Sequence, residues 1–197
     1  MDKLSYALGL SFGQQLAQSG IEIADYQSFA KGVEAVLTGS FPEVPIEECQ
    51  RILAEYFQNM KKNADEKAKA AKKDGEEFLV QNAKRPEVKT TASGLQYEII
   101  KEGNGKKPSA TDKVKVHYHG TLIDGTVFDS SVLRGQSAQF GVNQVISGWG
   151  EALQLMNTGA KYKLYIPSDL AYGAQGAGDL IKPHSALVFE VELLDIV

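Results

Sequence analysis

The sequence predicts an α+β protein: an all-helical N-terminal region, a long connecting helix, and a C-terminal antiparallel sheet that curls around one short helix. Three observations lead to this prediction. Before residue 60, apolar residues recur at three- and four-residue steps, which is the period of an amphipathic helix. A highly charged stretch without large apolar residues follows. After Pro86, segments rich in valine, isoleucine, tyrosine and phenylalanine alternate at the two-residue period of strands.

The overall composition is that of an ordinary globular protein. The 197 residues are 43% hydrophobic and 23% charged, which is enough apolar material for a sizeable core. The formal net charge of -4 argues against a non-specific nucleic-acid binder, which is normally basic. The single cysteine, Cys49, excludes an intrachain disulfide. No 18-residue apolar run and no secretory signal are found, so we expect no membrane contact and a cytoplasmic location, although a chain with a cleaved leader would read the same.

Residues 1–44 are predicted to hold two short helices. The apolar stripe of the first consists of Leu4, Ala7, Leu8, Phe12 and Leu16. The stripe of the second consists of Tyr26, Phe29, Ala30, Val33, Val36 and Leu37. The first helix should end at Ser19-Gly20, while the second should begin after Asp25 and end at Gly39.

A helical segment of this size rarely closes its own core, and oligomerisation is a common remedy. Gly9 and Gly13 lie four residues apart on the first helix, where they would allow another backbone to approach closely. We therefore predict that residues 1–44 and the start of the next helix form the core of a homodimer. The alternative is an ordinary intrachain helical subdomain.

Residues 45–86 are predicted to form one long connecting helix. Pro45 suits the first helical position, and Pro86 disfavours helix in the residue before it. From Lys61 to Glu77, 11 of the 17 residues are charged, so this stretch should be polar on all sides and cross solvent. Gly75 is the weak point of the pattern, and we expect a flexible joint there.

Residues 87–197 are predicted to form a separate domain built mainly of strands. The strand-like segments are Leu95–Lys101, Lys113–Leu122, Lys161–Pro167 and Ser185–Val197. Asp124-Gly125 indicates a two-residue hairpin turn, and a short helix is expected near Gly148–Leu155. Because strands and helices do not alternate regularly, the sheet should be antiparallel.

Motifs for covalent or metal chemistry are scarce. His117 and His119 share one strand face, but no third metal ligand is apparent. The glycine-rich segment Gly173–Gly178 lacks the lysine and the strand-to-helix context of a phosphate loop, so an ordinary surface loop is expected. No cofactor and no metal are therefore expected.

Four ordered segments resemble one known family. They are VHYHGTLIDGTVFDSS (116–131), QVISGWGEALQLM (144–156), IPSDLAYG (166–173) and LVFEVELL (187–194). Over Ser93–Val197 the sequence resembles the FK506-binding protein family of peptidyl-prolyl cis-trans isomerases. More loosely, LSYALGLSFGQQLAQSG and FAKGVEAVLTG resemble the dimeric, long-helix members related to macrophage infectivity potentiator, over Leu4 to Pro86.

The resemblance implies a half-barrel sheet around a short helix, with an apolar pocket between them. The residues that match the family's pocket are Tyr118, Phe128, Asp129, Val145, Ile146, Trp149, Tyr172 and Phe189. Of these, the resemblance implies catalytic roles for Tyr118, Phe128, Asp129 and Tyr172, and Trp149 as the floor. Leu180 and Ile181 match a flap, and Arg134 matches a polar partner of the aspartate. Ala138 and Ala177 depart from the family pattern, where larger residues are common, and leave the rim smaller.

The resemblance implies an isomerase of X-Pro peptide bonds that assists protein folding. The expected partners are proline-containing peptides, unfolded proteins and a second copy of the chain, with macrolides such as FK506 or rapamycin as inhibitors. No nucleic acid is expected among them. The alternative is a chaperone-like binding module that holds unfolded chains with little turnover.

Overall fold

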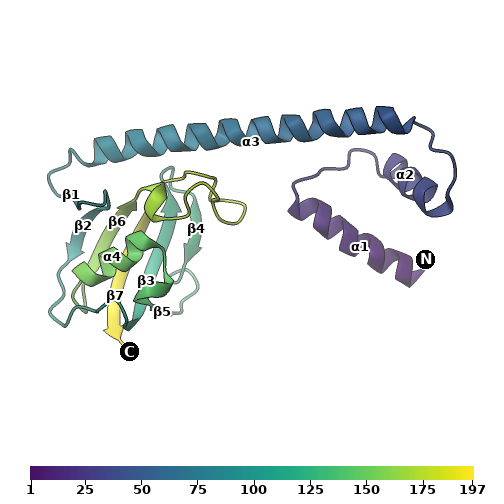
Figure 1. Cartoon of the computed structure of the whole chain (residues 1–197). Coiled ribbons are helices and arrows are strands. Elements are labelled where there is room, and N and C mark those ends of the chain that lie inside the picture. The colour runs from purple at the N-terminus through teal and green to yellow at the C-terminus, as the bar shows by residue number, and fades with distance from the viewer. The chain divides into compact units, whose positions relative to one another are not determined.

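The computed structural model describes residues 1–197, which divide into two compact units, Met1–Asn59 and Met60–Val197. The first unit contains α1 (Lys3–Gln18), α2 (Tyr26–Thr38) and the start of α3 (Ile46–Asn82). The second contains the rest of α3, the sheet and α4 (Ser147–Leu155), as labelled in Figure 1. None of the helices combines the length and the hydropathy needed to cross a bilayer.

Local sequence signals set the ends of the first two helices; the end of α1 and both ends of α2 are as predicted. The Asp2 carboxylate accepts a hydrogen bond from the Ser5 N–H (2.7 Å) and caps α1. Asp25 caps α2 by accepting from the backbone N–H of the second and third helical residues. Gly39 ends α2 in the left-handed conformation, with φ 67°.

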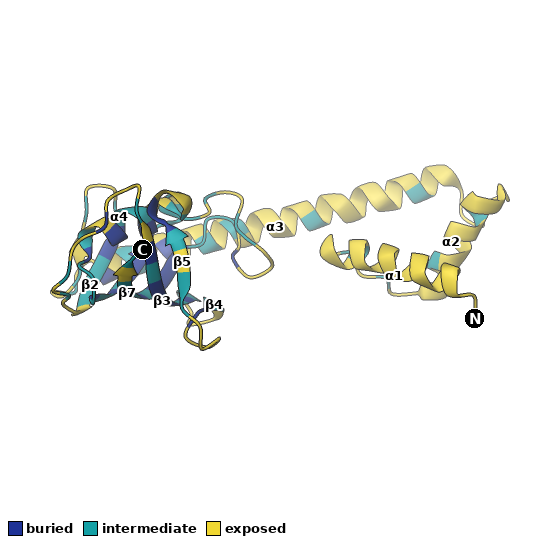
Figure 2. Ribbon diagram, turned by 90° about the horizontal axis from the view of Figure 1, so that it is seen from below, coloured by how far each residue is buried: buried dark blue, intermediate teal, exposed yellow.

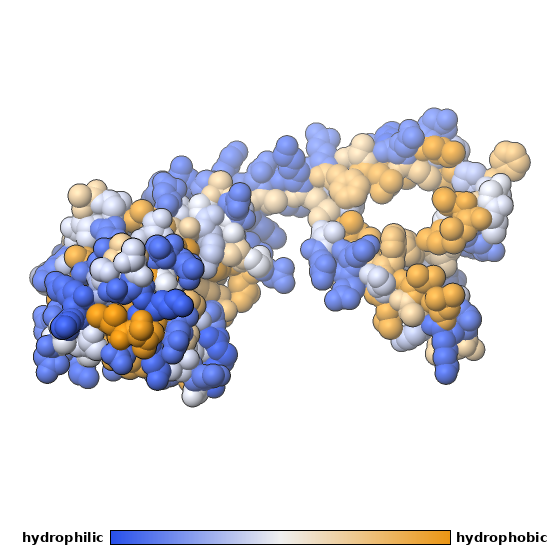
Figure 3. Space-filling model, turned by 60° about the horizontal axis from the view of Figure 1, so that its bottom comes forward, coloured by the Kyte–Doolittle hydropathy of each residue, from blue (hydrophilic) through white to orange (hydrophobic).

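The apolar stripes of α1 and α2 are hardly buried by the rest of the chain. Neither helix contains a buried residue, and Figure 2 draws both almost wholly in the colour of exposed residues. The Phe12 and Phe29 rings stack at 6.2 Å between centroids, so the two helices do touch. Between them lies an open groove of about 1180 Å³. In Figure 3 many apolar residues of the helical unit are visible at its surface.

The long helix α3 is continuous, and Gly75 is not the flexible joint that we predicted. Gly75 is buried, and a Cβ atom placed on it would lie 3.0 Å from the Cβ of Ala186. The glycine therefore permits a close approach between the helix and the C-terminal domain. Further along, the Phe78 and Tyr165 rings lie 5.9 Å apart, so the last turns of α3 are packed and not surrounded by solvent.

A short polar network fastens the end of α3 to the sheet. The buried Asn82 side chain donates to the buried Gln96 side chain (2.9 Å), which itself donates to the Leu79 carbonyl (2.9 Å). Arg85 donates to the Tyr165 hydroxyl (2.9 Å) and to Glu98 (2.7 Å). Every buried polar group in this network is thus paired, as a stable interface requires.

The C-terminal unit is built on one antiparallel sheet. The strands are β1 (Lys89–Thr90), β2 (Gln96–Lys101), β3 (Lys113–Leu122), β4 (Val127–Ser130), β5 (Ala138–Gly141), β6 (Lys161–Ile166) and β7 (Leu187–Ile196). They follow the order β1-β2-β6-β7-β3-β4, and β5 also pairs with β3. Helix α4 lies across one face of this sheet (Figure 1), so the predicted antiparallel sheet around a short helix is confirmed.

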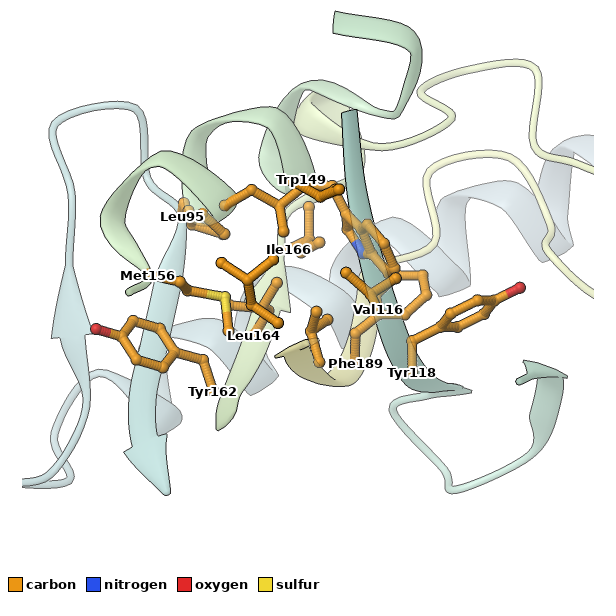
Figure 4. Packing of buried hydrophobic residues seen from close by; sticks show 14 of the residues in the cluster. Leu95, Val116, Tyr118, Trp149, Met156, Tyr162, Leu164, Ile166 and Phe189 are labelled. Atoms are coloured by element: carbon orange, nitrogen blue, oxygen red, sulfur yellow. The ribbon is translucent and has the colours of Figure 1, made fainter. Parts of the chain in front are cut away.

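The core lies between α4 and the sheet. Strand β3 alternates buried and half-buried residues along its length, as the sequence pattern predicted. The buried side chains from β3, β6, β7 and α4 form one cluster, drawn in Figure 4. Its largest fully buried members are Leu95, Leu153, Met156, Leu164, Ile166, Leu187 and Leu193.

Two local predictions in this domain are incomplete or wrong. The turn after β3 has three residues, Ile123, Asp124 and Gly125, and not two, because the Leu122 N–H donates to the Thr126 carbonyl (2.9 Å). Gly125 takes φ 88°, which closes the turn with the bulge typical of three-residue hairpins. In addition, the short strands β1 and β5 were not predicted.

Candidate active site

Four aromatic side chains from four different elements meet at one end of the core. Trp149 of α4 contacts Tyr118 of β3 edge-on at 5.3 Å and Phe189 of β7 edge-on at 5.2 Å. Phe128 of β4 meets Phe189 edge-on at 5.3 Å. Edge-to-face contacts at these distances are the favourable geometry for aromatic pairs, so the rings hold one another in place.

A glycine in β3 makes room for two of these rings. A Cβ atom placed on Gly120 would lie 2.7 Å from an atom of the Phe189 ring and 2.8 Å from the Phe128 ring. Such contacts are too short for any larger residue. Gly120 therefore lets the two phenylalanines approach the sheet backbone and stand beside Trp149.

Trp149 forms the base of this aromatic group. Its side chain is only 4% exposed, and its Nε1 has no hydrogen-bond partner in the chain. In Figure 4 the indole points into the buried cluster, whereas the Tyr118 hydroxyl points away from it. Phe128, Val145 and Ile146 are half-buried and pack against this cluster. The site thus offers an apolar surface with a rigid indole beneath it.

A polar group borders the aromatic surface. The Tyr118 hydroxyl donates to one carboxylate oxygen of Asp129, and Arg134 Nη1 pairs with the other. Arg134 Nη2 also donates to the Tyr118 hydroxyl (2.9 Å), and its guanidinium lies 5.7 Å from the centre of the Tyr118 ring. The three side chains form a closed triangle, which orients all of them.

The triangle determines the charge state of its members. Burial opposes ionisation of Asp129, but the hydrogen bonds from Tyr118 and Arg134 outweigh it, so the pKa of Asp129 is lowered. Burial, and then the hydrogen bond to Asp129, raises the pKa of Tyr118. The hydrogen bond to Asp129 raises the pKa of Arg134. At neutral pH the site therefore holds a carboxylate, a neutral phenol and a guanidinium, and none of them is poised to act as a general base.

Two hydrogen-bond donors at the site have no partner within the chain. The Ile146 N–H donates to no group, while the Ile146 carbonyl accepts from the N–H groups of Trp149 (2.9 Å) and Gly150 (3.1 Å) at the start of α4. The Tyr172 hydroxyl is likewise free, on a side chain that is 40% exposed. Both donors are available to a bound molecule.

Comparison with known proteins identifies the family. The model of FKBP-type peptidyl-prolyl cis-trans isomerases matches residues 104–194, and that of the domain amino-terminal to such isomerases matches residues 1–99. The FKBP-type 22 kDa peptidyl-prolyl cis-trans isomerase of Escherichia coli is 48% identical over 192 residues, covering 98% of this chain and 93% of that protein. This chain belongs to the FKBP-type peptidyl-prolyl cis-trans isomerases.

Other FKBP-type relatives match both units of the chain. The peptidyl-prolyl cis-trans isomerase Mip of Coxiella burnetii is 40% identical over 207 residues, covering 99% of this chain and 86% of that protein. The crystal structure of FkpA from Escherichia coli superposes with a TM-score of 0.71 at 36% identity, covering 98% of this chain and 95% of that one. The protein is therefore a peptidyl-prolyl cis-trans isomerase, and its FKBP domain binds prolyl peptides.

The two expected flap residues of this FKBP-type isomerase differ in exposure. Leu180 is exposed, whereas Ile181 is buried in the hydrophobic cluster. Ile181 exchanges two backbone hydrogen bonds with Ala177 (2.8 and 3.2 Å), which closes the loop between them. Ile181 therefore anchors the loop from inside, and Leu180 is the member that faces solvent.

Sequence reasoning missed several residues that surround the aromatic group and the polar triangle. Phe140, which we did not place among the pocket residues, is half-buried and meets Trp149 edge-on at 5.8 Å. Its strand, β5, follows a loop and pairs with β3, so only the fold brings it to the site. Ser130 and Ser131 are buried directly after Asp129, although serine in an FDSS segment carries no sequence signal for burial.

The two histidines of β3 lie on the other face of the sheet. His117 and His119 border a small hollow of about 170 Å³ together with Lys161, Glu190 and Glu192. Lys161 pairs with Glu190 at 2.8 Å, so one of the two carboxylates there already has a cation. No three side chains among histidine, cysteine, aspartate and glutamate gather closely enough to hold a metal ion.

Proposed function

We propose that this isomerase rotates X-Pro bonds on the aromatic surface above Trp149, between Tyr118, Phe128 and Phe189. One observation carries the proposal: the base of the surface is a buried indole that makes no hydrogen bond and is held edge-on by three aromatic rings. A rigid apolar base of this kind suits the ring of a proline. The half-buried side chains of Val145 and Ile146 add apolar contact.

The reaction needs only a moderate reduction of its barrier. Rotation about the peptide bond breaks amide resonance and costs about 18–20 kcal/mol. A turnover of about 10³ per second corresponds to a barrier of roughly 13 kcal/mol. The surface must therefore favour the twisted amide over the planar one by some 5–7 kcal/mol, roughly the difference between these barriers.

An apolar surface supplies such a preference without a covalent step. The planar amide is strongly polar because nitrogen and carbonyl are conjugated, and twisting removes much of this charge separation. Aromatic surroundings solvate the planar form poorly and the twisted form less badly, so they bind the transition state better than the ground state. The ionised Asp129 and neutral Tyr118 do not exchange protons with the substrate in this mechanism.

The polar groups at the edge hold the substrate in place. The free Ile146 N–H and the free Tyr172 hydroxyl donate hydrogen bonds to substrate carbonyls on either side of the proline. Asp129 orients Tyr118 and Arg134, and the triangle keeps that wall of the site from moving. The exposed Leu180 closes over the bound peptide, while Ile181 holds its loop in place. Macrolides such as rapamycin and FK506 occupy the same surface and inhibit.

The test replaces aromatic residues inside and outside the surface. Trp149→Leu and Phe128→Ala should each lower kcat/KM on a short X-Pro peptide about 10- to 100-fold and weaken rapamycin binding. The matched control is Tyr97→Leu, because Tyr97 stacks on Tyr162 (5.5 Å) at another part of the sheet. Its activity should equal that of the parent. Full activity in both site variants would show that the reaction takes place at another part of the molecule.

The biological substrates that we propose are unfolded proteins whose refolding waits on X-Pro bonds, handled by a homodimer. The support for the dimer is the uncovered apolar groove between α1 and α2. The same groove is the observation that favours a second candidate role, a chaperone-like holding of unfolded chains by the helical unit. In that case a monomeric variant should still suppress aggregation of an unfolded protein. If the dimer serves catalysis alone, the monomeric variant should lose refolding activity on protein substrates and show no suppression of aggregation.

A further inference from the structure

Ser131 stands where β4 leaves the sheet, two residues after Asp129. Its side chain is fully buried, with 0% exposure. The Ser131 N–H donates to the Tyr118 carbonyl (3.0 Å), and the Ser131 Oγ accepts from the Tyr118 N–H (2.7 Å). Both backbone groups of Tyr118 on this edge of β3 are thus paired with the same serine.

The Ser131 hydroxyl oxygen takes the place of a backbone carbonyl as the acceptor for the Tyr118 N–H. In each hydrogen-bonded pair of an antiparallel ladder, the two opposite residues exchange both of their backbone hydrogen bonds. Here the side-chain oxygen replaces the carbonyl, which leaves the Ser131 carbonyl free to accept from the Gln136 N–H (3.2 Å). The strand therefore continues its pairing for one more position while its backbone already turns away from the sheet.

This turn brings the members of the polar triangle together. The Arg134 N–H donates to the Ser130 carbonyl (3.3 Å), so the chain folds back within five residues of Asp129. The side chain of Arg134 then reaches both Asp129 and the Tyr118 hydroxyl. The serine pairs with the backbone of Tyr118, while Asp129 and Arg134 pair with its phenol.

We propose that Ser131 is a positioning residue of the isomerase reaction, which sets Asp129 and Arg134 against Tyr118 by replacing one backbone carbonyl of the β3–β4 ladder. This inference rests on the aromatic surface and the polar triangle proposed above as the site. Ser131 touches no substrate and acts only through the three side chains of the triangle.

His117 completes the hydrogen bonding of this serine from the other face of the sheet. Its Nδ1 lies 3.1 Å from the Ser131 Oγ, and the Tyr118 carbonyl lies 3.2 Å from the same oxygen. A hydroxyl has one proton to donate and two lone pairs that accept. If the serine donates to the Tyr118 carbonyl, it accepts from the Tyr118 N–H and from a proton on His117 Nδ1. All three contacts are then satisfied, so the hydroxyl has a single orientation.

The test is a double-mutant cycle on the full-length protein, with kcat/KM for a short X-Pro peptide as the readout. Ser131→Ala should lower kcat/KM about tenfold, because the buried Tyr118 N–H loses its acceptor and the triangle loosens. Asp129→Asn should also lower kcat/KM. In the Asp129→Asn background, Ser131→Ala should change kcat/KM less than about twofold, since the two residues act as a unit.

Controls separate positioning from loss of stability. Val114→Ala removes a fully buried side chain from the other end of β3, so it destabilises the domain but should leave kcat/KM unchanged. Ser131→Cys keeps a similar shape with a weak acceptor, and it should show a smaller loss than Ser131→Ala. This variant keeps the test decisive should the alanine variant fail to fold.

The outcomes distinguish this inference from the site on which it rests. If Asp129→Asn keeps parental kcat/KM, the polar triangle is not part of the site and both statements fail. If Asp129→Asn is impaired but the two substitutions multiply in the double variant, Ser131 is merely structural and this inference alone is overturned. Parental kcat/KM in folded Ser131→Ala and Ser131→Cys would overturn it as well.

Discussion

The two units of this isomerase use equally regular apolar patterns and bury them very differently. In the catalytic unit, most of the large apolar residues of β3, β6, β7 and α4 are buried in one cluster. In the helical unit, Leu8 remains 63% exposed and Phe12 51% exposed, although both lie on a clear amphipathic stripe. A periodic stripe thus shows that a helix has a partner, but not whether the partner is in the same chain.

The size of each unit explains the contrast. A domain of well over a hundred residues buries about two thirds of the surface of its unfolded chain, whereas a unit of about 60 residues buries less and is marginal alone. Large apolar side chains that line the groove between α1 and α2, among them Leu8 and Phe12, also remain exposed in the single chain. A second copy of the chain would cover these side chains.

The strongest disruption should come from a charge placed in the groove. Leu8→Glu puts two carboxylates into the proposed dimer interface, where burial of unpaired charge is costly. The dimer dissociation constant should rise at least about 100-fold, which corresponds to roughly 3 kcal/mol. Analytical ultracentrifugation over a dilution series measures it. Gln14→Glu, on the same helix but outside the groove, should behave like the parent; equal dimerisation of both variants would refute the interface.

A second experiment tests whether the end of α3 belongs to the catalytic unit. Gly75→Leu would force a side chain against Ala186, whose Cβ already lies 3.0 Å from the position of a new Cβ. The free energy of unfolding of the catalytic unit should fall by about 1–3 kcal/mol, as measured by urea titration. If helix propensity alone mattered, the variant would gain about 1 kcal/mol instead.

The glycines of the helical unit provide a finer test. In the single chain, a Cβ on Gly9, Gly13 or Gly32 would meet nothing within 4 Å, so alanine should stabilise each helix by about 1 kcal/mol. Gly9 and Gly13 line the groove, whereas Gly32 does not. If a second backbone lies close to α1, Gly9→Ala and Gly13→Ala should weaken the dimer about tenfold, and Gly32→Ala should not. If all three alanine variants stabilise the protein and leave the dimer unchanged, no second backbone lies close to α1.

The smallest change in kcat/KM is expected when the pH is varied. Asp129 has a lowered pKa because the hydrogen bonds from Tyr118 and Arg134 outweigh its burial, and Tyr118 has a pKa raised first by burial. Their charge states are therefore constant between about pH 6 and 9, given ordinary values of about 4 and 10. In this range kcat/KM should be flat in a protease-coupled assay. An inflection near pH 6.5 would instead implicate a histidine.

The same shifts predict where stability changes. The contribution of Asp129 is present above its unfolded pKa of about 3.9 and is lost as pH falls through its lower folded value. The contribution of Tyr118 is present below about pH 10 and is lost as pH rises through its higher folded value. The effect of Asp129 should be small, since its side chain is 43% exposed and screened by solvent. Thermal unfolding followed by circular dichroism measures both contributions.

Features that depend on neighbours in the chain were predictable from the sequence. Asp25 and Gly39 mark the ends of α2 because capping and left-handed termination involve only adjacent residues. The alternation along β3 gave its buried face, and the absence of regular strand–helix alternation gave an antiparallel sheet. These signals are local, so tertiary contacts did not override them.

Features that depend on distant contacts were not predictable in the same way. Gly75 reads as a weak point within its helix, and only Ala186, more than a hundred residues later, explains why a glycine lies there. Strand β5 is too short to stand out, and its pairing with β3 defines it. The aromatic site residues lie on separate elements, so the family resemblance and not their spacing suggested them. Ser131 was missed because its role depends on where β4 departs from β3.

Trp149 is the only tryptophan of the chain, and it lies beneath the surface that we propose for catalysis. Its emission spectrum should therefore come wholly from this one location, and its wavelength should be that of an indole screened from water. Binding of rapamycin or a prolyl peptide against the indole ring should change the intensity of the tryptophan fluorescence directly. The protein thus carries an optical reporter of site occupancy that needs no label and is blind to events in the helical unit.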